Sequence, residues 1–356
     1  MKNLSDYADD INKCSKCGLC QSVCPIYKIT GNDCAVSRGK FVMLEGIING
    51  DLKFNKTIEK YLDMCLKCGK CKEFCPSGID VCEIFNIAKY ECAKNSLHYK
   101  LEKFFESKLI FGSILKFFKT INHNNKQSHT ETTKQKLLYF KGCVNYIHPK
   151  TEKSLKKILS KLDVELIEKD FECCGLPFLS SGNLERFEEV KQHNLKLVEE
   201  NTDYILTDCA SCENTLKTYV TEKKFINAIE FLSTQNIKFK FKNPTKITFH
   251  KPCHQKNDDF ISAILEKCEN VEYIEMKDYD ECCGFAGAFA VKNQKLSAKM
   301  TKQKAENIID TQADYVVTTC PACEIGLKQG FILLNKKAPK IMNFVDFLAL
   351  STIETE

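Results

Sequence analysis

The chain has 356 residues, and its 52 Lys and Arg against 47 Asp and Glu give a formal net charge of +5. A chain of this length is expected to form two or three domains. Outside one basic segment the charge is close to neutral, which argues against a nucleic-acid-binding protein. No stretch approaches the roughly 20 apolar residues that a membrane-spanning helix needs.

The chain contains 22 cysteines. Cysteine-rich disulfide proteins are usually short and secreted. Here the N-terminus carries Asp6, Asp9 and Asp10 in place of the apolar core of a signal peptide. We therefore expect a cytoplasmic protein whose thiols stay reduced and bind metal.

Residues 1–95 are predicted to form a mainly helical domain, with helices at 39–49, 57–64 and 81–94. The domain contains the pattern Cys-x2-Cys-x2-Cys-x3-Cys-Pro twice, which is the pattern of bacterial ferredoxins that hold two [4Fe-4S] clusters. The cysteines are Cys14, Cys17, Cys20 and Cys24 in the first motif, and Cys65, Cys68, Cys71 and Cys75 in the second.

Three cysteines of each motif lie on one tight turn, so the fourth ligand of each cubane cluster must come from elsewhere. In two-cluster ferredoxins the fourth cysteine serves the other cluster. We therefore assign one cluster to Cys14, Cys17, Cys20 and Cys75, and the other to Cys65, Cys68, Cys71 and Cys24. Zinc knuckles would predict pairs of Cys-x2-Cys instead. Two such clusters pass single electrons and perform no bond chemistry on a substrate.

Residues 96–134 form a separate segment that is rich in Leu, Phe, Ile and Lys and ends in a polar linker. Its apolar residues do not form one helical stripe, so a helix packed between domains is the first interpretation. The flanking lysines favour the alternative, which is docking to a membrane surface or to a quinone-reactive partner. The second interpretation would make the protein peripheral on the inner face of the membrane.

The remaining chain is a tandem duplication of residues 135–242 and 243–350. Cys143 and Cys253 are 110 residues apart, and Cys212 and Cys323 are 111 apart. Short apolar strands alternate with helices in both copies, which predicts two α/β lobes with largely parallel sheets. Each copy supplies five cysteines, which follow strand ends: Cys143, Cys173, Cys174, Cys209 and Cys212 in the first, and Cys253, Cys282, Cys283, Cys320 and Cys323 in the second.

Five thiolates are one more than a cubane cluster requires, and this number favours an open, non-cubane site. Adjacent cysteines can bracket one metal centre only in a tight turn, which Gly175 and Gly284 permit. We expect one or two further [4Fe-4S] clusters here. A zinc site that uses four of the five cysteines is the alternative for one copy, and disulfides are disfavoured in a reducing compartment.

The segments Cys282-Cys283-Gly284-Phe285-Ala286-Gly287 and Thr319-Cys320-Pro321-Ala322-Cys323 carry a specific resemblance. Over nearly its whole length the chain resembles iron-sulphur proteins with two Cys-Cys-Gly domains behind a two-cluster ferredoxin domain. That family includes the iron-sulphur subunit of glycolate oxidase, lactate-utilisation proteins, one of the subunits of anaerobic glycerol-3-phosphate dehydrogenase and the catalytic subunit of heterodisulfide reductase. The resemblance implies electron transfer from a flavoprotein towards quinone in most members, and disulfide cleavage at a non-cubane cluster in the last.

No nicotinamide or flavin site is predicted, because no Gly-x-Gly-x-x-Gly follows a strand and no phosphate-binding loop is present. Electrons must therefore enter and leave through partner proteins. We expect an electron-transfer subunit of a flavoprotein complex that oxidises a 2-hydroxy acid such as glycolate or lactate and reduces quinone. The alternatives are a catalytic subunit that cleaves a disulfide, as in heterodisulfide reductase, and the corresponding subunit of anaerobic glycerol-3-phosphate dehydrogenase.

His254 directly follows Cys253, where an imidazole could protonate a thiolate that leaves an iron. It is the one candidate catalytic residue, and a hydrogen bond that only supports a ligand is the alternative role. The first copy has Val144 at this position. The cysteines outside the four sets are predicted to be small buried apolar residues; they are Cys34, Cys82, Cys92 and Cys268.

Overall fold

The N-terminal part of the protein is helical, as predicted. The computed structural model describes residues 2–94, 135–198 and 202–355, so the basic segment at 96–134 lies outside the described residues. The three predicted helices are α4 (Ser37–Ile48), α5 (Lys56–Asp63) and α7 (Val81–Ala93). The shorter elements are η1 (Leu4–Tyr7), α1 (Ala8–Asn12), α2 (Leu19–Ser22), α3 (Pro25–Thr30), η2 (Asp33–Ala35) and α6 (Lys70–Glu73).

The helices of this part pack around their own apolar core. Phe41 and Leu44 of α4 meet Phe85 of α7 there, and all three side chains are fully buried. The ring centroids of Phe41 and Phe85 are 5.5 Å apart. This packing fixes the two loops that carry the ferredoxin-type cysteines.

The first lobe is a four-stranded parallel sheet in the order β2-β1-β3-β4. Its strands are β1 (Gln135–Tyr139), β2 (Val164–Glu168), β3 (Tyr204–Thr207) and β4 (Phe225–Asn227). Its helices are α10 (Cys143–Ile147), α11 (Lys150–Leu159), α12 (Leu176–Ser181), α13 (Leu184–Leu195), α14 (Ala210–Leu216) and α15 (Ala228–Thr234).

The second lobe repeats this topology in the order β6-β5-β7-β8, and a further strand pairs antiparallel with β5. Its strands are β5 (Ile237–His250), β6 (Cys268–Tyr273), β7 (Tyr315–Thr318), β8 (Lys340–Asn343) and β9 (Thr352–Thr355). Its helices are α16 (Asp259–Glu266), α17 (Gly287–Lys292), α18 (Gln294–Thr311), α19 (Pro321–Leu334) and α20 (Phe344–Leu348). The expected fold class, a helical domain followed by two α/β lobes with parallel sheets, is confirmed.

The division expected at residues 242 and 243 falls inside β5. Ile237, Phe239 and Phe241 are buried and alternate with exposed lysines, so the strand begins well before the expected start of the second copy. A period of two is typical of a strand with one buried face. The first part of β5 belongs to the second sheet, because Phe239 pairs with both Cys268 of β6 and Ile353 of β9.

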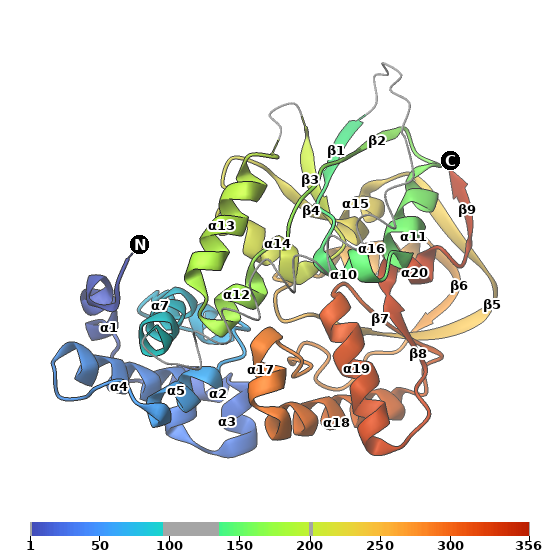
Figure 1. Cartoon of the computed structure of the whole chain (residues 1–356). Helices are drawn as coiled ribbons and strands as arrows, with labels where there is room; N and C mark the ends of the chain where they lie inside the picture. The colour runs from blue at the N-terminus through green and yellow to red at the C-terminus, as the bar shows by residue number, and fades with distance from the viewer. Residues whose placement is uncertain (1, 95–134, 199–201, 356) are drawn as a thin grey trace.

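The two lobes share their hydrophobic cores. One cluster contains Leu137 and Leu206 of the first sheet together with Phe249 and Val317 of the second. Figure 1 shows the N-terminal helices gathered at one end of the molecule, where α7 meets α12 and α12 meets α17. The N-terminal helices therefore contact the first lobe through α12, and α12 contacts α17 of the second lobe.

Candidate metal centres

Each ferredoxin-type motif begins with the same unusual turn. Lys16 and Lys67, which precede the second cysteine of each motif, both have left-handed backbones with φ of 57° and 55°. Few residues other than glycine adopt this conformation. Pro25 then begins α3 directly after Cys24. The repeated turn brings three cysteines of each motif together, as the spacing predicts.

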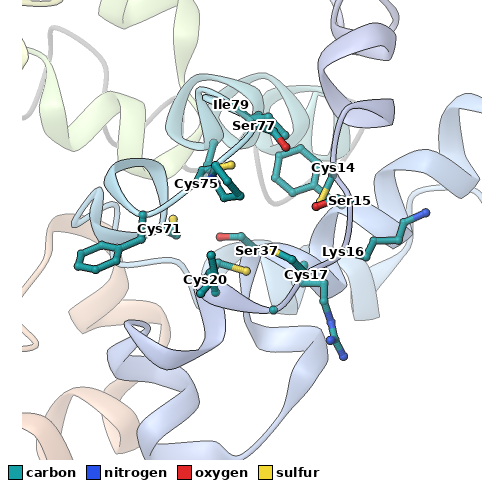
Figure 2. Close-up of a pocket in the computed structure, with 17 residues that line it drawn as sticks. Cys14, Ser15, Lys16, Cys17, Cys20, Ser37, Cys71, Cys75, Ser77 and Ile79 are labelled. Carbon is teal, nitrogen blue, oxygen red and sulfur yellow. The ribbon is translucent and has the colours of Figure 1, made fainter.

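The first candidate centre lies between the two motifs. Cys14, Cys17 and Cys20 line one pocket together with Cys71 and Cys75 of the other motif (Figure 2). The pocket has an empty volume of about 400 Å³, far more than the roughly 30 Å³ that one water occupies. Four of these five cysteines, Cys14, Cys17, Cys20 and Cys75, are the set that the sequence assigns to one cluster, and that assignment stays a prediction.

The second candidate centre collects the remaining cysteines. Burial and the neighbouring Cys65 and Cys68 thiols raise the pKa of Cys71. Burial and the nearby Cys65 thiol raise the pKa of Cys24, from the first motif, and Cys24 in turn contributes to the raised pKa of Cys71. Cys24 therefore lies near cysteines of both motifs, and the exchange of Cys24 and Cys75 between the clusters stays a prediction.

The Cys-Cys-Gly turns require their glycines. Gly175 and Gly284 have φ of 97° and 81°. A Cβ atom on Gly175 would lie 2.5 Å from Cδ2 of Phe187, and one on Gly284 would lie 2.5 Å from Cβ of Met300. These turns let Cys173 approach Cys143, with 3.8 Å between their Sγ atoms. In the second lobe the Sγ atoms of Cys283 and Cys323 are 3.5 Å apart.

Both five-cysteine sets line one cavity with an empty volume of about 960 Å³. The lobes meet at Cys209 and Cys320, where a hydrogen bond from the Cys209 thiol lowers the pKa of Cys320 well below its usual range. The 22 cysteines, all within the described residues, form no disulfide. Converging, buried, soft sulfur donors fit iron-sulphur clusters, and they also fit zinc where four of them suffice.

The second ferredoxin-type centre adjoins the second lobe. Burial and the charge of Cys253 raise the pKa of Cys68 well above its usual range. Cys24 and Cys68 pack in one apolar cluster with Cys253 and Cys282. The four cysteine sets therefore follow one another through the molecule, and each is in contact with the next.

His254 lies where three parts of the protein meet. Its Nε2 is 2.9 Å from the carbonyl oxygen of Lys67, and its Nδ1 is 3.0 Å from Oγ of Ser211. A carbonyl oxygen can only accept, so Nε2 carries the proton and donates. Ser211 in turn lies 3.4 Å from Sγ of Cys320. The side chain is buried and lines the cavity.

Sequence reasoning missed His250, at the end of β5. It is fully buried, and within the described residues neither ring nitrogen has a hydrogen-bond partner. Burial and the charge of Lys304 hold the pKa of His250 well below its usual range. Its ligand atoms lie within 4.8 Å of those of Cys283 and Cys323. A comparison of the two copies would have pointed to His250, because three residues before the first cysteine the second copy has this histidine where the first has Phe140.

Sequence reasoning also missed a buried polar group at the first lobe's site. The Oδ2 atom of Asp208 accepts hydrogen bonds from Tyr139 at 2.9 Å and from Asn145 at 2.6 Å. Burial raises the pKa of Asp208 to about 6, although the two hydrogen bonds lower it. At the corresponding positions of the second lobe, the hydroxyl of Thr319 donates a hydrogen bond to the side-chain oxygen of Gln255. Asp208 and Asn145 line the shared cavity, and their counterparts Thr319 and Gln255 are not among the residues that line it.

The four cysteines outside the sets are not alike. Cys268 is buried, as predicted, and its thiol donates to the carbonyl of Ile264 at 3.3 Å. Cys34 is exposed, so the prediction of burial is wrong for it, because η2 lies at the surface. Cys82 and Cys92 are half-buried, and Cys82 lies near the Cys65 and Cys71 thiols.

Comparisons with known proteins match this architecture. The family model described as "4Fe-4S dicluster domain" matches residues 10–79, and the one described as "Cysteine-rich domain" matches residues 137–217 and 247–328. The chain is similar to a solved hypothetical protein from Helicobacter pylori, at 12% identity and a TM-score of 0.53 over 88% of this chain and 67% of that one. This likeness concerns the fold alone.

Three curated relatives are similar over most of their length. One of the subunits of the fumarate reductase (CoM/CoB) of Methanothermobacter marburgensis is 26% identical over 97% of this chain and 74% of its own. One of the subunits of the dihydromethanophenazine:CoB–CoM heterodisulfide reductase of Methanosarcina acetivorans is 23% identical, and the probable glycolate oxidase iron-sulfur subunit of Bacillus subtilis is 21% identical, each over 90% of this chain and 89% of its own.

Among the described residues, none of the helices combines the length and the apolar character needed to cross a bilayer. The relatives are named as subunits of multi-subunit oxidoreductases. With its dicluster domain followed by two cysteine-rich domains, the chain belongs to the Cys-Cys-Gly family of iron-sulphur proteins.

Proposed function

We propose that this protein is the electron-transfer subunit of an oxidoreductase complex. The observation that carries the proposal is the order of the four cysteine sets, each in contact with the next, from the pocket at Cys14 to the cavity at Cys209. Four bound clusters, two cubane in the N-terminal part and two with five thiolates each in the lobes, would supply one-electron storage along this line.

The residues of the chain hold and insulate this line. The first set is Cys14, Cys17, Cys20 and Cys75, the second is Cys65, Cys68, Cys71 and Cys24, and the lobes supply five cysteines each. Lys67 and Lys89 are buried between the N-terminal helices and α12, and donate to the carbonyl oxygens of Leu179 and Ser180 at its end. These contacts hold the N-terminal part against the lobes.

The partner that we propose is a flavoprotein dehydrogenase that oxidises a 2-hydroxy acid, with quinone as the electron acceptor. Likeness to a glycolate oxidase subunit and to a lactate utilization protein supports this choice. The test is anaerobic purification of the native complex, followed by addition of glycolate, lactate or glycerol 3-phosphate. We expect glycolate or lactate, but not glycerol 3-phosphate, to reduce the clusters and so to decrease their visible absorbance. If none of the three substrates decreases the absorbance, this partner is overturned.

A second candidate function is the interconversion of a disulfide and two thiols in the shared cavity. Two observations favour it: both five-cysteine sets are complete and open into one volume of about 960 Å³, and a relative is named as a heterodisulfide reductase subunit. Reduction of a disulfide takes two electrons, delivered along the cysteine sets, and two protons. In this candidate His254 is the catalytic side chain, because it lines the cavity and reaches Cys320 through Ser211.

One experiment separates the two candidates. The reduced complex is mixed with an organic disulfide, and the thiols released are counted against the electrons lost. Two thiols for every two electrons, abolished by His254→Ala without loss of iron, would support thiol and disulfide chemistry. No thiol release from a complex that still bleaches with a 2-hydroxy acid would leave electron transfer as the whole function.

A further inference from the structure

The unpartnered imidazole of His250 is the feature that neither candidate function uses. Its side chain has no exposed surface, and within the described residues both ring nitrogens lack a partner. A buried polar group without a hydrogen bond is unfavourable, and such groups are rare in native proteins. A metal ion is a partner that a neutral imidazole binds well.

The ring is placed where a metal would be. One ligand atom each from His250, Cys283 and Cys323 lie within 4.8 Å of one another, and all three residues are buried. They come from three different elements: the end of β5, the Cys-Cys-Gly turn and the first turn of α19. Three elements thus deliver a mixed nitrogen and sulfur ligand set to one point.

The first lobe carries a different group at the same place. Phe140 stands at the position of His250, and its ring packs against Phe171 with 5.0 Å between the centroids. The same strand end therefore carries an apolar ring in one copy and a ligand-competent ring in the other. The imidazole is therefore present at the second of the two duplicated sites, which is the one next to Cys68.

We infer that His250 is a nitrogen ligand to iron in the second Cys-Cys-Gly site, together with Cys283 and Cys323, so that the first site is all-thiolate and the second is mixed. This inference rests on the proposed binding of iron there. Imidazole is a known ligand of iron in clusters, and its replacement of thiolate raises their reduction potential. The second site would then be the more easily reduced of the pair.

The test uses the full chain, purified anaerobically with its clusters after growth with 15N-histidine, and reads nitrogen couplings by pulsed electron paramagnetic resonance. A strong isotope-dependent coupling of a directly bound nitrogen is expected. It should disappear in H250F, which copies the first lobe, and in H250C, which keeps a metal ligand at the position. The half-buried His193 of α13 supplies the control, since H193Q should leave the coupling unchanged.

The outcomes separate this inference from the function on which it rests. Iron at the second site without a strong nitrogen coupling would overturn His250 as a ligand and leave electron transfer intact. Zinc in place of iron at that site, seen by X-ray absorption, would overturn both the iron ligand and the proposed electron path through the second lobe. H250C is the variant that decides if H250F does not fold.

Discussion

The Nε2 atom of His254 lies 2.9 Å from the carbonyl oxygen of Lys67, in the turn between Cys65 and Cys68. One imidazole thus joins the N-terminal part to the cavity, because its other nitrogen meets Ser211 beside Cys320. The hydrogen bond crosses from the second cysteine set to the cavity that holds the third and fourth. It is a direct polar link between the two kinds of centre.

His254→Ala should remove both bonds and leave the buried carbonyl oxygen of Lys67 without this donor, whereas Ser211 keeps its contact with Cys320. We expect the free energy of unfolding to fall by about 1–3 kcal/mol, the usual cost of such groups. Electron transfer from the N-terminal centres to the lobes should slow, while iron content stays unchanged. Chemical denaturation and stopped-flow absorbance measure the two effects.

Ser211→Ala is the matched variant, because it keeps the bond to Lys67 and loses only the link to Cys320. It should transfer electrons at nearly the normal rate and lose disulfide turnover if the second candidate function holds. Equal rates of electron transfer in His254→Ala and the normal protein would contradict the role given to the Lys67 contact.

Cys75→Ser and Cys24→Ser should damage different centres. Because Cys75 lines the pocket of Cys14 and Cys24 lies with Cys65, each change should cost the cluster of the other motif. Each variant should lose up to about four of roughly 16 iron atoms. Electron paramagnetic resonance of the reduced protein identifies the missing signal, and the same signal lost in both variants would refute the exchange of ligands.

Gly284→Ala should disrupt the second Cys-Cys-Gly site. The new methyl group would need a left-handed backbone and would lie 2.5 Å from Cβ of Met300. Gly50→Ala is the control, because Gly50 has φ of 83° but no atom within 4 Å of the added Cβ. Backbone strain alone costs about 1–3 kcal/mol. We expect a larger loss for Gly284→Ala, with loss of iron that Gly50→Ala does not share.

Cys268 and Cys34 should react very differently with an alkylating reagent. Burial raises the pKa of Cys268 to about 12, so its thiol stays neutral at pH 8, and the side chain is inaccessible. Cys34 is exposed. Only the thiolate is nucleophilic. Peptide mass spectrometry of the folded protein should find Cys34 modified and Cys268 intact, and comparable labelling of both would contradict the burial.

The same shift predicts a pH dependence of stability. A thiol whose pKa is raised by folding stabilises the folded state fully below its unfolded value of about 8.5. That contribution is lost as the pH rises towards 12. Between these values, the normal protein should lose stability more steeply than Cys268→Ala does, as measured by denaturation at a series of pH values.

Much of the fold could be predicted from the sequence, because the repeat aligns two copies of each strand and each cysteine. The short strands β4 and β8 could not, because they are only three and four residues long, and Asn227 and Asn343 cap the helices that follow them. The sequence also places the start of β5 too late, because the pairing of its first residues with β9 is visible only in the structure.

The cavity could not be predicted, for a different physical reason. The sequence places Cys209 and Cys320 at strand ends of separate copies, but only tertiary packing decides that these ends face each other. His250 escapes sequence reasoning because an isolated histidine in a strand is usually part of a core. Its significance depends on two sulfur atoms that lie 33 and 73 residues further along the chain.

The hydrophobic core that both lobes share makes each lobe dependent on the other. Neither sheet buries its apolar face alone, since Leu137 and Phe249 belong to one cluster, and the amide of Ala210 donates to the carbonyl of Thr319 across the lobes at 2.9 Å. A single lobe would therefore expose half of this core and half of the cavity. The two copies therefore depend on each other for burial as one folding unit, although equivalent positions such as Phe140 and His250 differ between them.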